Sequence, residues 1–186
     1  MPEHVPEVAW DIVPLGHAEA AAALREAGAP ARGFLGLDPV TQNDALLTRT
    51  LERAEARVLR AGETLVGAAP NPLQPRQSQV ATTSADAAAV RALVDFLVAY
   101  RRTTSCLALV PHGAPAVSAF LGCGFTDRGV LRGHRYASGA YHDVRVLFGN
   151  GFGGGFGNGF GGGPDDDAGD GSGTGPGDGF PRTVDA

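Results

Sequence analysis

A chain of 186 residues has room for one folded domain and an appended segment, because domains commonly contain about 100–150 residues. The formal net charge of −5 equals the charge of the segment from Phe148 onward, which holds six Asp and one Arg. The residues before it are therefore neutral as a group. Nucleic-acid binding needs a basic surface that neutralises phosphates, so this charge distribution argues against a nucleic-acid-binding protein.

The cysteines and the N-terminal residues suggest a compartment and exclude several kinds of site. Cys106 and Cys123 lie in separate apolar segments without a CxxC spacing, which argues against a zinc site and against a disulfide framework. The first residues lack the basic and then apolar run of a signal peptide, and no stretch reaches the roughly 18–20 apolar residues of a membrane span. We expect a cytoplasmic protein without a metal or a membrane contact.

The first third of the chain predicts one strand and two helices. Residues 8–16 (VAWDIVPLG) form a short apolar run typical of an opening strand. The alanine-rich residues 17–27 predict a helix that ends at Gly28. The pair Asp38-Pro39 resembles a helix start, and the apolar spacing that continues to Ala54 predicts a second helix.

A hairpin and a third strand are expected next. Residues 57–60 and 63–69 predict two short strands that turn at Ala61-Gly62. A further strand is expected at residues 78–82. Regular structure should be interrupted before it by three prolines: Pro70, Pro72 and Pro75.

The second half of the chain carries the clearest helix. Thr83 and Asp86 have the T-x-x-D spacing of a capping arrangement. Apolar residues then recur at helical spacing as Val90, Leu93, Val94, Leu97 and Val98. The continuous apolar residues 105–110 (SCLALV) predict a strand buried on both faces.

The last predicted elements are a short helix and two strands. The helix covers residues 115–124, and the strands cover 125–136 and 141–148 around Ser138-Gly139. The complete order, β α α β β β α β α β β, predicts an α/β fold with a mixed central sheet.

Two motifs in this order resemble those of the Gcn5-related N-acetyltransferase (GNAT) superfamily. The stretch APAVSAFLGCGF is similar to the family's A-x-x-x-[YF]-x-x-x-G-F, and GAYHDVRVLF is similar to its G-x-x-x-D final hairpin. The resemblance spans residues 8–148. It implies a GNAT-like sheet and transfer of an acyl group from acyl-CoA to an amine, either a small amine or a protein N-terminus.

The resemblance also implies where acyl-CoA would bind. In the family the fourth and fifth strands splay apart, so that the fourth can pair with the pantetheine arm, and the next helix presents N–H groups to the pyrophosphate. Val80 falls on the strand-four position. Thr82, Thr83 and Ser84 could donate hydrogen bonds to phosphate oxygens, and Ala88 falls on the first glycine of the R-x-x-G-x-[GA] motif.

This sequence departs from the family at most positions that bind the ligand. The arginine and both glycines of that motif are replaced by Ala85, Ala88 and Val90. Gly113 stands where many relatives have an asparagine, and Phe120 where many have a tyrosine that protonates the departing thiolate. Folding residues of the short helix are retained: Ala116, Gly124 and Phe125.

Three residues are the predicted catalytic groups. Acyl transfer to an amine needs a group that accepts the ammonium proton and one that protonates the thiolate. His112, just past the strand at 105–110, is the expected base. Tyr136 and Tyr141 flank the last turn and are the expected proton donors. A loop histidine and packed tyrosines without catalytic roles explain the same sequence.

The octamer FGNGFGGG occurs twice in succession at residues 148–163. Its glycine content predicts a disordered segment, so we divide the chain into a GNAT-like domain at residues 1–148 and a Gly/Asp-rich tail at residues 149–186. The repeated phenylalanines could mediate self-association.

Two alternatives to a CoA-dependent enzyme remain open. The first is a GNAT-like module that binds a metabolite or a partner protein without catalysis, which would explain why folding residues remain and ligand residues are replaced. The second is an acyltransferase whose thioester is bound to a carrier protein, which would make the pyrophosphate site unnecessary.

Overall fold

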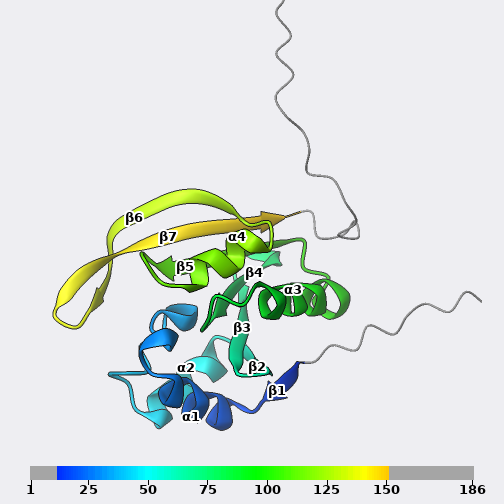
Figure 1. Ribbon diagram of the computed structural model, residues 1–186. Coiled ribbons are helices and arrows are strands. Elements are labelled where there is room, and N and C mark those ends of the chain that lie inside the picture. The colour runs from blue at the N-terminus through cyan, green and yellow to red at the C-terminus, as the bar shows by residue number, and fades with distance from the viewer. Residues whose placement is uncertain (1–11, 151–186) are drawn as a thin grey trace, which may run out of the picture. The chain divides into compact units, whose positions relative to one another are not determined.

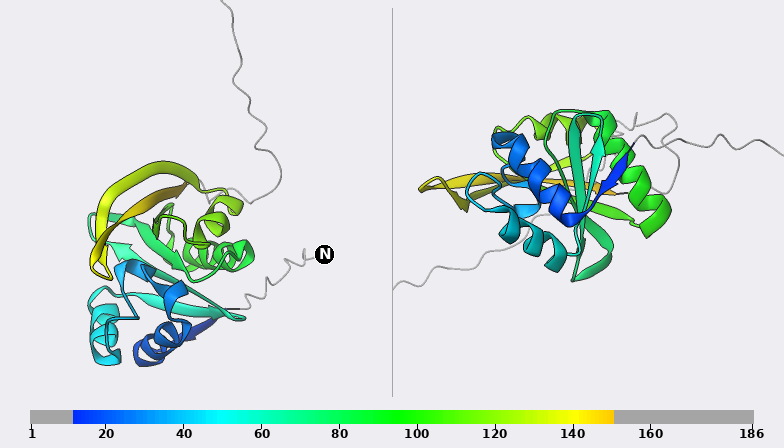
Figure 2. Two further views of the ribbon diagram at one scale, coloured as in Figure 1. Left: turned by 60° about the vertical axis from the view of Figure 1, so that its left-hand side comes forward. Right: turned by 90° about the horizontal axis from the view of Figure 1, so that it is seen from below.

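The computed structural model describes residues 12–150, which form one seven-stranded sheet with helices packed on both of its faces (Figures 1 and 2). The strands are β1 (Val13–Leu15), β2 (Arg57–Ala61), β3 (Thr64–Asn71), β4 (Gln74–Thr82), β5 (Ser105–Pro111), β6 (Thr126–Ala137) and β7 (Ala140–Asn150). The helices are α1 (His17–Ala27), α2 (Asp44–Arg53), α3 (Ala87–Arg101) and α4 (Ala116–Gly122), with 3-10 turns η1 (Ala29–Ala31) and η2 (Phe34–Gly36). Apart from these turns, the observed order is the predicted one.

The sheet is mixed, as the sequence predicts. Its strands are ordered β1-β2-β3-β4-β5-β7-β6. β4 and β5 run parallel with α3 as the crossover between them, and the other neighbours are antiparallel. The β6–β7 hairpin turns at Ser138 and Gly139, whose φ angles of 53° and 81° are typical of a two-residue hairpin loop.

Two apolar clusters hold the layers together. Successive side chains of a strand point to opposite faces, so β3 and β4 contribute to both clusters. One cluster joins α3 and α4 to the sheet through residues such as Val66, Leu93 and Phe120. The other joins α1, α2 and the η1–η2 segment to the opposite face through residues such as Leu24, Phe34 and Leu65.

Two helix starts differ from the prediction. α2 begins after Asn43, whose side chain accepts from the Leu46 N–H at 2.9 Å, whereas Asp38 accepts from the Val40 N–H within a separate turn. α3 begins after Asp86, whose Oδ1 accepts from the Ala88 and Ala89 N–H groups at 2.8 and 3.2 Å. Asp86 is thus the N-cap itself, and it is not the N3 residue of a capping box whose N-cap is Thr83.

The prolines do not interrupt the sheet where the sequence suggested. Pro70 lies within β3 and Pro75 within β4, on either side of the turn that joins these strands. β3 pairs with β2 only as far as Ala68, and β4 pairs with β5 only from Gln77. Each proline therefore lies where its strand has one fewer neighbour, and a missing N–H is tolerated there.

Two further expectations about strands need correction. β5 alternates between buried and half-buried residues and is not fully buried on both faces. β7 continues to Asn150, where Gly149 and Asn150 pair with Cys106 and Ser105 of β5. The domain thus extends two residues past the predicted boundary. The rest of the proposed tail and the start of the predicted opening strand lie outside the described residues.

Within residues 12–150, none of the helices is both long and apolar enough to cross a membrane.

Candidate functional site

Strands β4 and β5 diverge in a fork. Their parallel pairing covers only Gln77 to Gln79 against Ser105 to Leu107. Beyond that point, residues 80–82 of β4 pair with β3 and residues 108–111 of β5 pair with β7. In this part of the described sheet, one side of each strand has no strand partner, which is the separation that the sequence resemblance implied.

The far end of the fork is almost filled. The cavity there has a volume of ≈20 Å³ and is lined by residues of the fork, of the η1–η2 segment and of the loop before α4. That volume is close to the minimum for one water molecule. Phe34 and Ala81 line this space from opposite elements. A ligand lying along the fork therefore needs these elements to move.

The loop between β4 and α3 uses its own N–H groups. The Asp86 carboxylate binds the Ala88 and Ala89 amides at the start of α3. The Asp86 amide itself donates to Ser84 Oγ at 3.1 Å. A pyrophosphate bound at this helix start would have to displace the carboxylate and would meet its negative charge.

The predicted phosphate-binding hydroxyls also have internal partners. Thr82 Oγ1 accepts from the Ser84 amide, and Ser84 Oγ lies 2.9 Å from Thr64 Oγ1. Thr83 is buried, and its Oγ1 accepts from the Leu65 N–H at 3.0 Å. These three side chains fasten the loop to the sheet.

The two remaining predicted CoA positions differ in accessibility. The Val80 side chain is buried in the core, and Ala68 of β3 is its neighbour on one side of the strand. On the other side, which faces the fork, only the Val80 backbone could contact a ligand. Ala88 is exposed in the first turn of α3, and its amide is one of the two that Asp86 binds. Neither side chain hinders a ligand, because Val80 points away from the fork and Ala88 is small.

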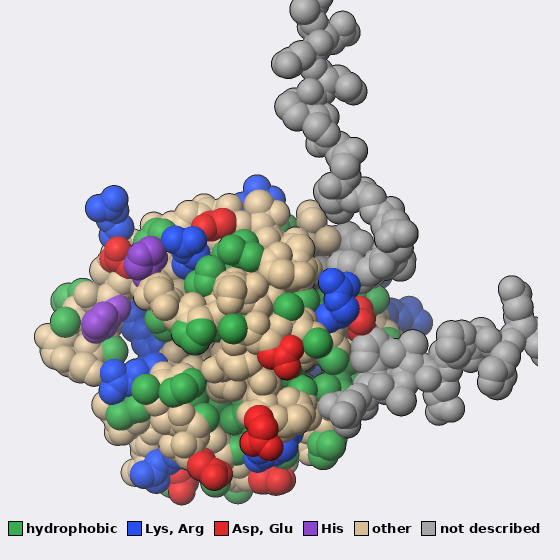
Figure 3. Space-filling view, viewed as in Figure 1, with side chains coloured by type: hydrophobic (Ala, Val, Ile, Leu, Met, Phe, Trp, Pro, Cys, Tyr) green, Lys and Arg blue, Asp and Glu red, His purple; other side chains and the backbone are tan. Residues whose placement is uncertain are grey.

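A second cavity lies at the C-terminal end of β5, beside the end of the hairpin. We call it the hairpin pocket. It has a volume of ≈410 Å³ and is lined by two arginines, two histidines, one tyrosine, one aspartate and small apolar residues. Figure 3 shows basic and histidine side chains grouped around a hollow on the left of the molecule, where the hairpin leaves the sheet. Arg32 and Pro111 line both this pocket and the end of the fork.

His112 lies in the hairpin pocket. It follows directly after β5. Its backbone amide donates to the backbone oxygen of Asp143 at 2.9 Å, which fixes the loop against β7. Asp143 is also a lining residue, and its side-chain Oδ1 accepts from the Gly133 N–H at 2.8 Å. The predicted base and a carboxylate are thus brought to one cavity.

Two arginines from distant parts of the chain meet at the same pocket. Arg32, between η1 and η2, donates from Nη1 to Ser138 Oγ at 3.0 Å, and its Nε lies 3.8 Å from Asp38 Oδ1. Arg135 of β6 donates from Nη2 to the Leu37 oxygen at 2.7 Å. Burial lowers the pKa of the Arg135 guanidinium, Asp38 opposes that shift, and Arg32 adds to it.

Of the two predicted tyrosines, one lies in the pocket. Tyr141 is among the lining residues, although its side chain is 73% exposed. Tyr136 is not among them, and its ring packs against that of Tyr141 with centroids 5.2 Å apart. The structure therefore groups His112 with Tyr141, whereas Tyr136 supports Tyr141 from the side.

The positions of the missing asparagine and tyrosine have structural roles. Phe120 is fully buried and packs edge-to-face on Phe125, with centroids 5.0 Å apart. Gly113 has a φ of 81°, a conformation that glycine adopts without strain. α4 thus lacks a phenol at the position where the family has one.

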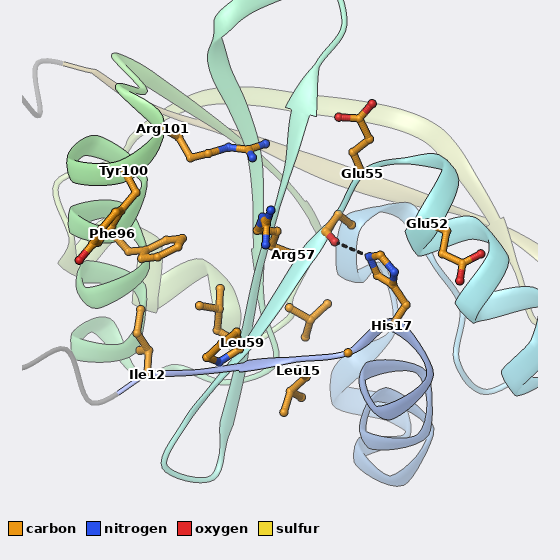
Figure 4. Close-up of a pocket in the computed structure, with 14 residues that line it drawn as sticks. Ile12, Leu15, His17, Glu52, Glu55, Arg57, Leu59, Phe96, Tyr100 and Arg101 are labelled. Atoms are coloured by element: carbon orange, nitrogen blue, oxygen red, sulfur yellow. Dashed lines mark hydrogen bonds between the residues drawn. The ribbon is translucent and has the colours of Figure 1, made fainter.

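A larger cavity lies elsewhere, between β1, β2 and α3. Its volume is ≈710 Å³, and Phe96 of α3 points across it toward Leu59 of β2 (Figure 4). His17 at its edge is held through Nε2 by the Ala56 oxygen at 3.0 Å. None of the predicted site residues lines it.

No protein-family model matches the chain, and no curated protein matches its sequence. Solved structures do match its fold. Spermidine N-acetyltransferase from Vibrio cholerae, in complex with CoA and spermine, superposes with a TM-score of 0.58 at 13% identity, over 75% of this chain and 94% of that one. The ribosomal L7/L12 alpha-N-protein acetyltransferase RimL, in complex with CoA, gives a TM-score of 0.55 at 12% identity, over 75% and 92%.

The chain has the GNAT fold. The resemblance inferred from the motifs is thereby confirmed for the architecture. At 12–18% identity the likeness to these enzymes concerns the fold and does not extend to substrates.

Sequence reasoning missed the basic side of the hairpin pocket. Arg32 lies in an irregular segment and Arg135 in a strand, so no spacing rule connects them. Arg135 contacts Leu37, and Arg32 contacts Ser138. Both contacts join the hairpin to the η1–η2 segment, which is far away in the sequence.

Proposed function

We propose that the protein is an N-acyltransferase that transfers an acyl group from acyl-CoA to an amine. The observation that carries this proposal is the junction of the β4–β5 fork with the hairpin pocket, which share Arg32 and Pro111. A thioester along the unpaired side of β4 would present its carbonyl at this junction, and an amine in the pocket would approach from the other side. The fold likeness to N-acetyltransferases supports the same assignment.

The chemistry needs two proton transfers. The amine nitrogen bonds to the thioester carbonyl carbon, the carbon–sulfur bond breaks, and an amide and a free thiol result. We assign His112 as the group that accepts the proton from the amine, and Tyr141 as the group that donates one to the leaving sulfur. Asp143 and the β4 backbone orient the two reactants.

The residues fit one part of acyl-CoA better than the other. The unpaired side of β4 suits a pantetheine arm, whose amides can form strand-like hydrogen bonds. The α3 N-terminus suits the pyrophosphate poorly, since Asp86 already binds its amides. We therefore expect acyl-CoA to be held mainly through its arm, and weakly.

A binding module without catalysis is the second candidate. It is favoured by two observations: the end of the fork offers only ≈20 Å³, and Asp86 occupies the amides at the α3 N-terminus. A carrier-bound thioester is a third possibility, because it would bring the arm without the nucleotide.

One assay separates the CoA-dependent transferase from the other two candidates. The full chain is incubated with acetyl-CoA and a panel of small amines and short peptides, and release of the free thiol is followed. A transferase releases thiol only when an amine is present. His112→Gln and Tyr141→Phe should each reduce kcat by about 100-fold or more, in the range usual for a lost acid or base.

The hairpin supplies matched controls for that assay. His134 and Tyr136 are exposed on β6 and lie outside the pocket lining, so His134→Gln and Tyr136→Phe should change kcat little. If none of the amines or peptides leads to thiol release, the proposal is contradicted. Equal losses for Tyr136→Phe and Tyr141→Phe would contradict the assignment of Tyr141.

A further inference from the structure

The hairpin pocket carries both signs of charge. Arg32 and Arg135 line it together with His112 and His142, and Asp143 is the carboxylate among the lining residues. Asp38 lies behind Arg32, with 3.8 Å between Asp38 Oδ1 and Arg32 Nε. A ligand in this cavity therefore meets two arginines, Arg32 between η1 and η2 and Arg135 on β6. It also meets an acidic residue, Asp143 on β7.

The guanidinium groups keep unused donors. Each guanidinium carries five N–H donors. Among the described residues, Ser138 Oγ accepts from Arg32 and the Leu37 oxygen accepts from Arg135. Arg32 Nε is buried and lies 3.8 Å from Asp38 Oδ1, so any donor that Arg32 offers a ligand is on its Nη atoms. Planar guanidinium groups with free N–H donors suit a carboxylate, which accepts two parallel hydrogen bonds.

The anchored side chains are also preorganised. The Arg32–Ser138 bond and the Arg135–Leu37 bond both join the η1–η2 segment to the hairpin. Fixing the two groups before binding reduces the entropy that a ligand must overcome. His142 is held in the same way, since the Ala137 oxygen accepts from its Nε2 at 3.0 Å.

The carboxylate end of the pocket suits a cation. Asp143 Oδ1 is bound by the Gly133 N–H, and its second oxygen has remaining acceptor capacity. The His112 amide donates to the backbone oxygen of Asp143, so the proposed base and this acidic residue lie on adjoining segments of the pocket wall. An ammonium group placed here would be beside the group that takes its proton.

We propose that the hairpin pocket binds an amino acid as a zwitterion, with its carboxylate on Arg32 and Arg135 and its amine toward Asp143 and His112. The volume of ≈410 Å³ lies within the range of small-molecule sites and leaves space for a side chain. The two arginines disfavour a polyamine, whose second ammonium group would lie beside like charge. As a statement about the acyl acceptor, this inference rests on the proposed transferase function.

The test uses pairs of ligands that differ by one carboxylate. Ornithine and putrescine form one pair, and other common amino acids form similar pairs with their decarboxylated amines. Binding to the full chain is measured by thermal shift and calorimetry without any acyl donor, up to about 10 mM, above the millimolar Kd of a weak ligand. At least one amino acid should raise Tm, and its decarboxylated partner should not.

A variant of Arg32 tests whether the basic side of the pocket binds the carboxylate. Arg32→Gln should weaken the amino acid by about tenfold or more, in the range of a lost charge-assisted hydrogen bond. Arg32 is half-buried at the surface, so the variant should fold. Arg132→Gln is the control, because Arg132 is exposed on β6, the strand of Arg135, and lies outside the pocket lining; the affinity of this variant should equal that of the wild type.

The outcomes separate this inference from the proposed function. An amino acid that binds, while no amine, amino acid or peptide is acylated, supports the inference and contradicts the transferase. A decarboxylated amine that is acylated while its amino acid is not overturns the inference and supports the transferase. Absence of binding by every amino acid tested, or binding unchanged by Arg32→Gln, also overturns the inference.

Discussion

The Arg135 side chain of β6 donates from Nη2 to the backbone oxygen of Leu37 at 2.7 Å, across 98 positions of the chain. This bond fastens the β6–β7 hairpin to the segment after η2. A hydrogen bond from a charged donor contributes roughly 1.5–3 kcal/mol when buried. Because Arg135 is half-buried, we expect Arg135→Gln to lower the free energy of unfolding by about 1–2 kcal/mol, measured by urea denaturation.

Arg132→Gln serves as the reference for that measurement. Arg132 is exposed on the same strand, so its replacement should change stability by less than about 0.5 kcal/mol. Equal stability of the two variants would show that the bond between hairpin and η2 segment contributes nothing.

Asp86 controls access to the amides at the start of α3. Asn is as good an N-cap as Asp, so Asp86→Asn should retain the stability of α3 while removing one negative charge. A unit charge at a helix terminus contributes about 0.3–1 kcal/mol. We therefore expect the Kd for acetyl-CoA, measured by calorimetry, to fall by about two- to fivefold.

Glu26→Gln removes one exposed negative charge on α1 and should leave that Kd unchanged. Asp86→Ala should in addition destabilise the protein by about 1 kcal/mol through loss of the cap. Weaker acetyl-CoA binding by Asp86→Asn would mean that the carboxylate helps to bind the ligand.

Two glycines of the η1–η2 segment form a matched pair. Gly33 and Gly36 have φ angles of 87° and 81°, so alanine is strained at both by about 1–2 kcal/mol. A Cβ on Gly33 would also collide with Arg135 Nη1 and lie 2.7 Å from Pro111 Cγ, whereas a Cβ on Gly36 meets nothing within 4 Å.

Gly33→Ala should therefore lose about 1–3 kcal/mol more stability than Gly36→Ala, as overpacking usually does. It should also weaken ligands of the hairpin pocket, since both displaced side chains line that cavity. Thermal denaturation and ligand titration of the two variants measure these effects. Equal losses for the two would place the hairpin farther from Gly33 than described.

The buried thiol of Cys106 makes stability depend on alkaline pH. Burial raises the pKa of this thiol to about 12. In the unfolded chain the thiol ionises near pH 8.5–9, whereas in the folded chain it keeps its proton. The unfolded state is therefore favoured by about 1.4 kcal/mol per pH unit between about pH 9 and pH 12.

Urea denaturation at pH 8 and pH 10 tests this sign. The wild type should lose about 1–2 kcal/mol more over this interval than Cys106→Ala, whose baseline loss of packing is the same at both pH values. A pH dependence that is identical in the two proteins would show that Cys106 ionises in the folded state.

The sequence predicted the element order because apolar spacing and turn residues are local signals. Residues 17–27 and 57–60 fell at the expected places, and the fork followed from the family resemblance. Helix starts were less predictable, since Asp38 and Asn43 are both good caps for α2, and residue type alone does not say which of the two is used. Burial of β5 was overestimated, because its apolar run does not reveal how well each face is covered.

The site was predictable only in part, for a physical reason. His112 follows β5 and Tyr141 lies at the start of β7, two elements that the sequence predicted, and both residues line the hairpin pocket. Arg32 and Arg135 reach the same pocket through long-range hydrogen bonds that leave no pattern in the sequence. The predicted phosphate ligands Thr83 and Ser84 lie in a polar turn, and the internal hydrogen bonds that they form there could not be read from the sequence.

Titration of acetyl-CoA into the full chain, with Asp86→Asn in parallel, tests the central claim most directly. The account predicts saturable, weak binding in the micromolar to millimolar range, and tighter binding by Asp86→Asn. It also predicts acyl transfer to an amine from the bound ligand. Absence of binding by both proteins at about 10 mM, well above a millimolar Kd, would contradict a CoA-dependent transferase.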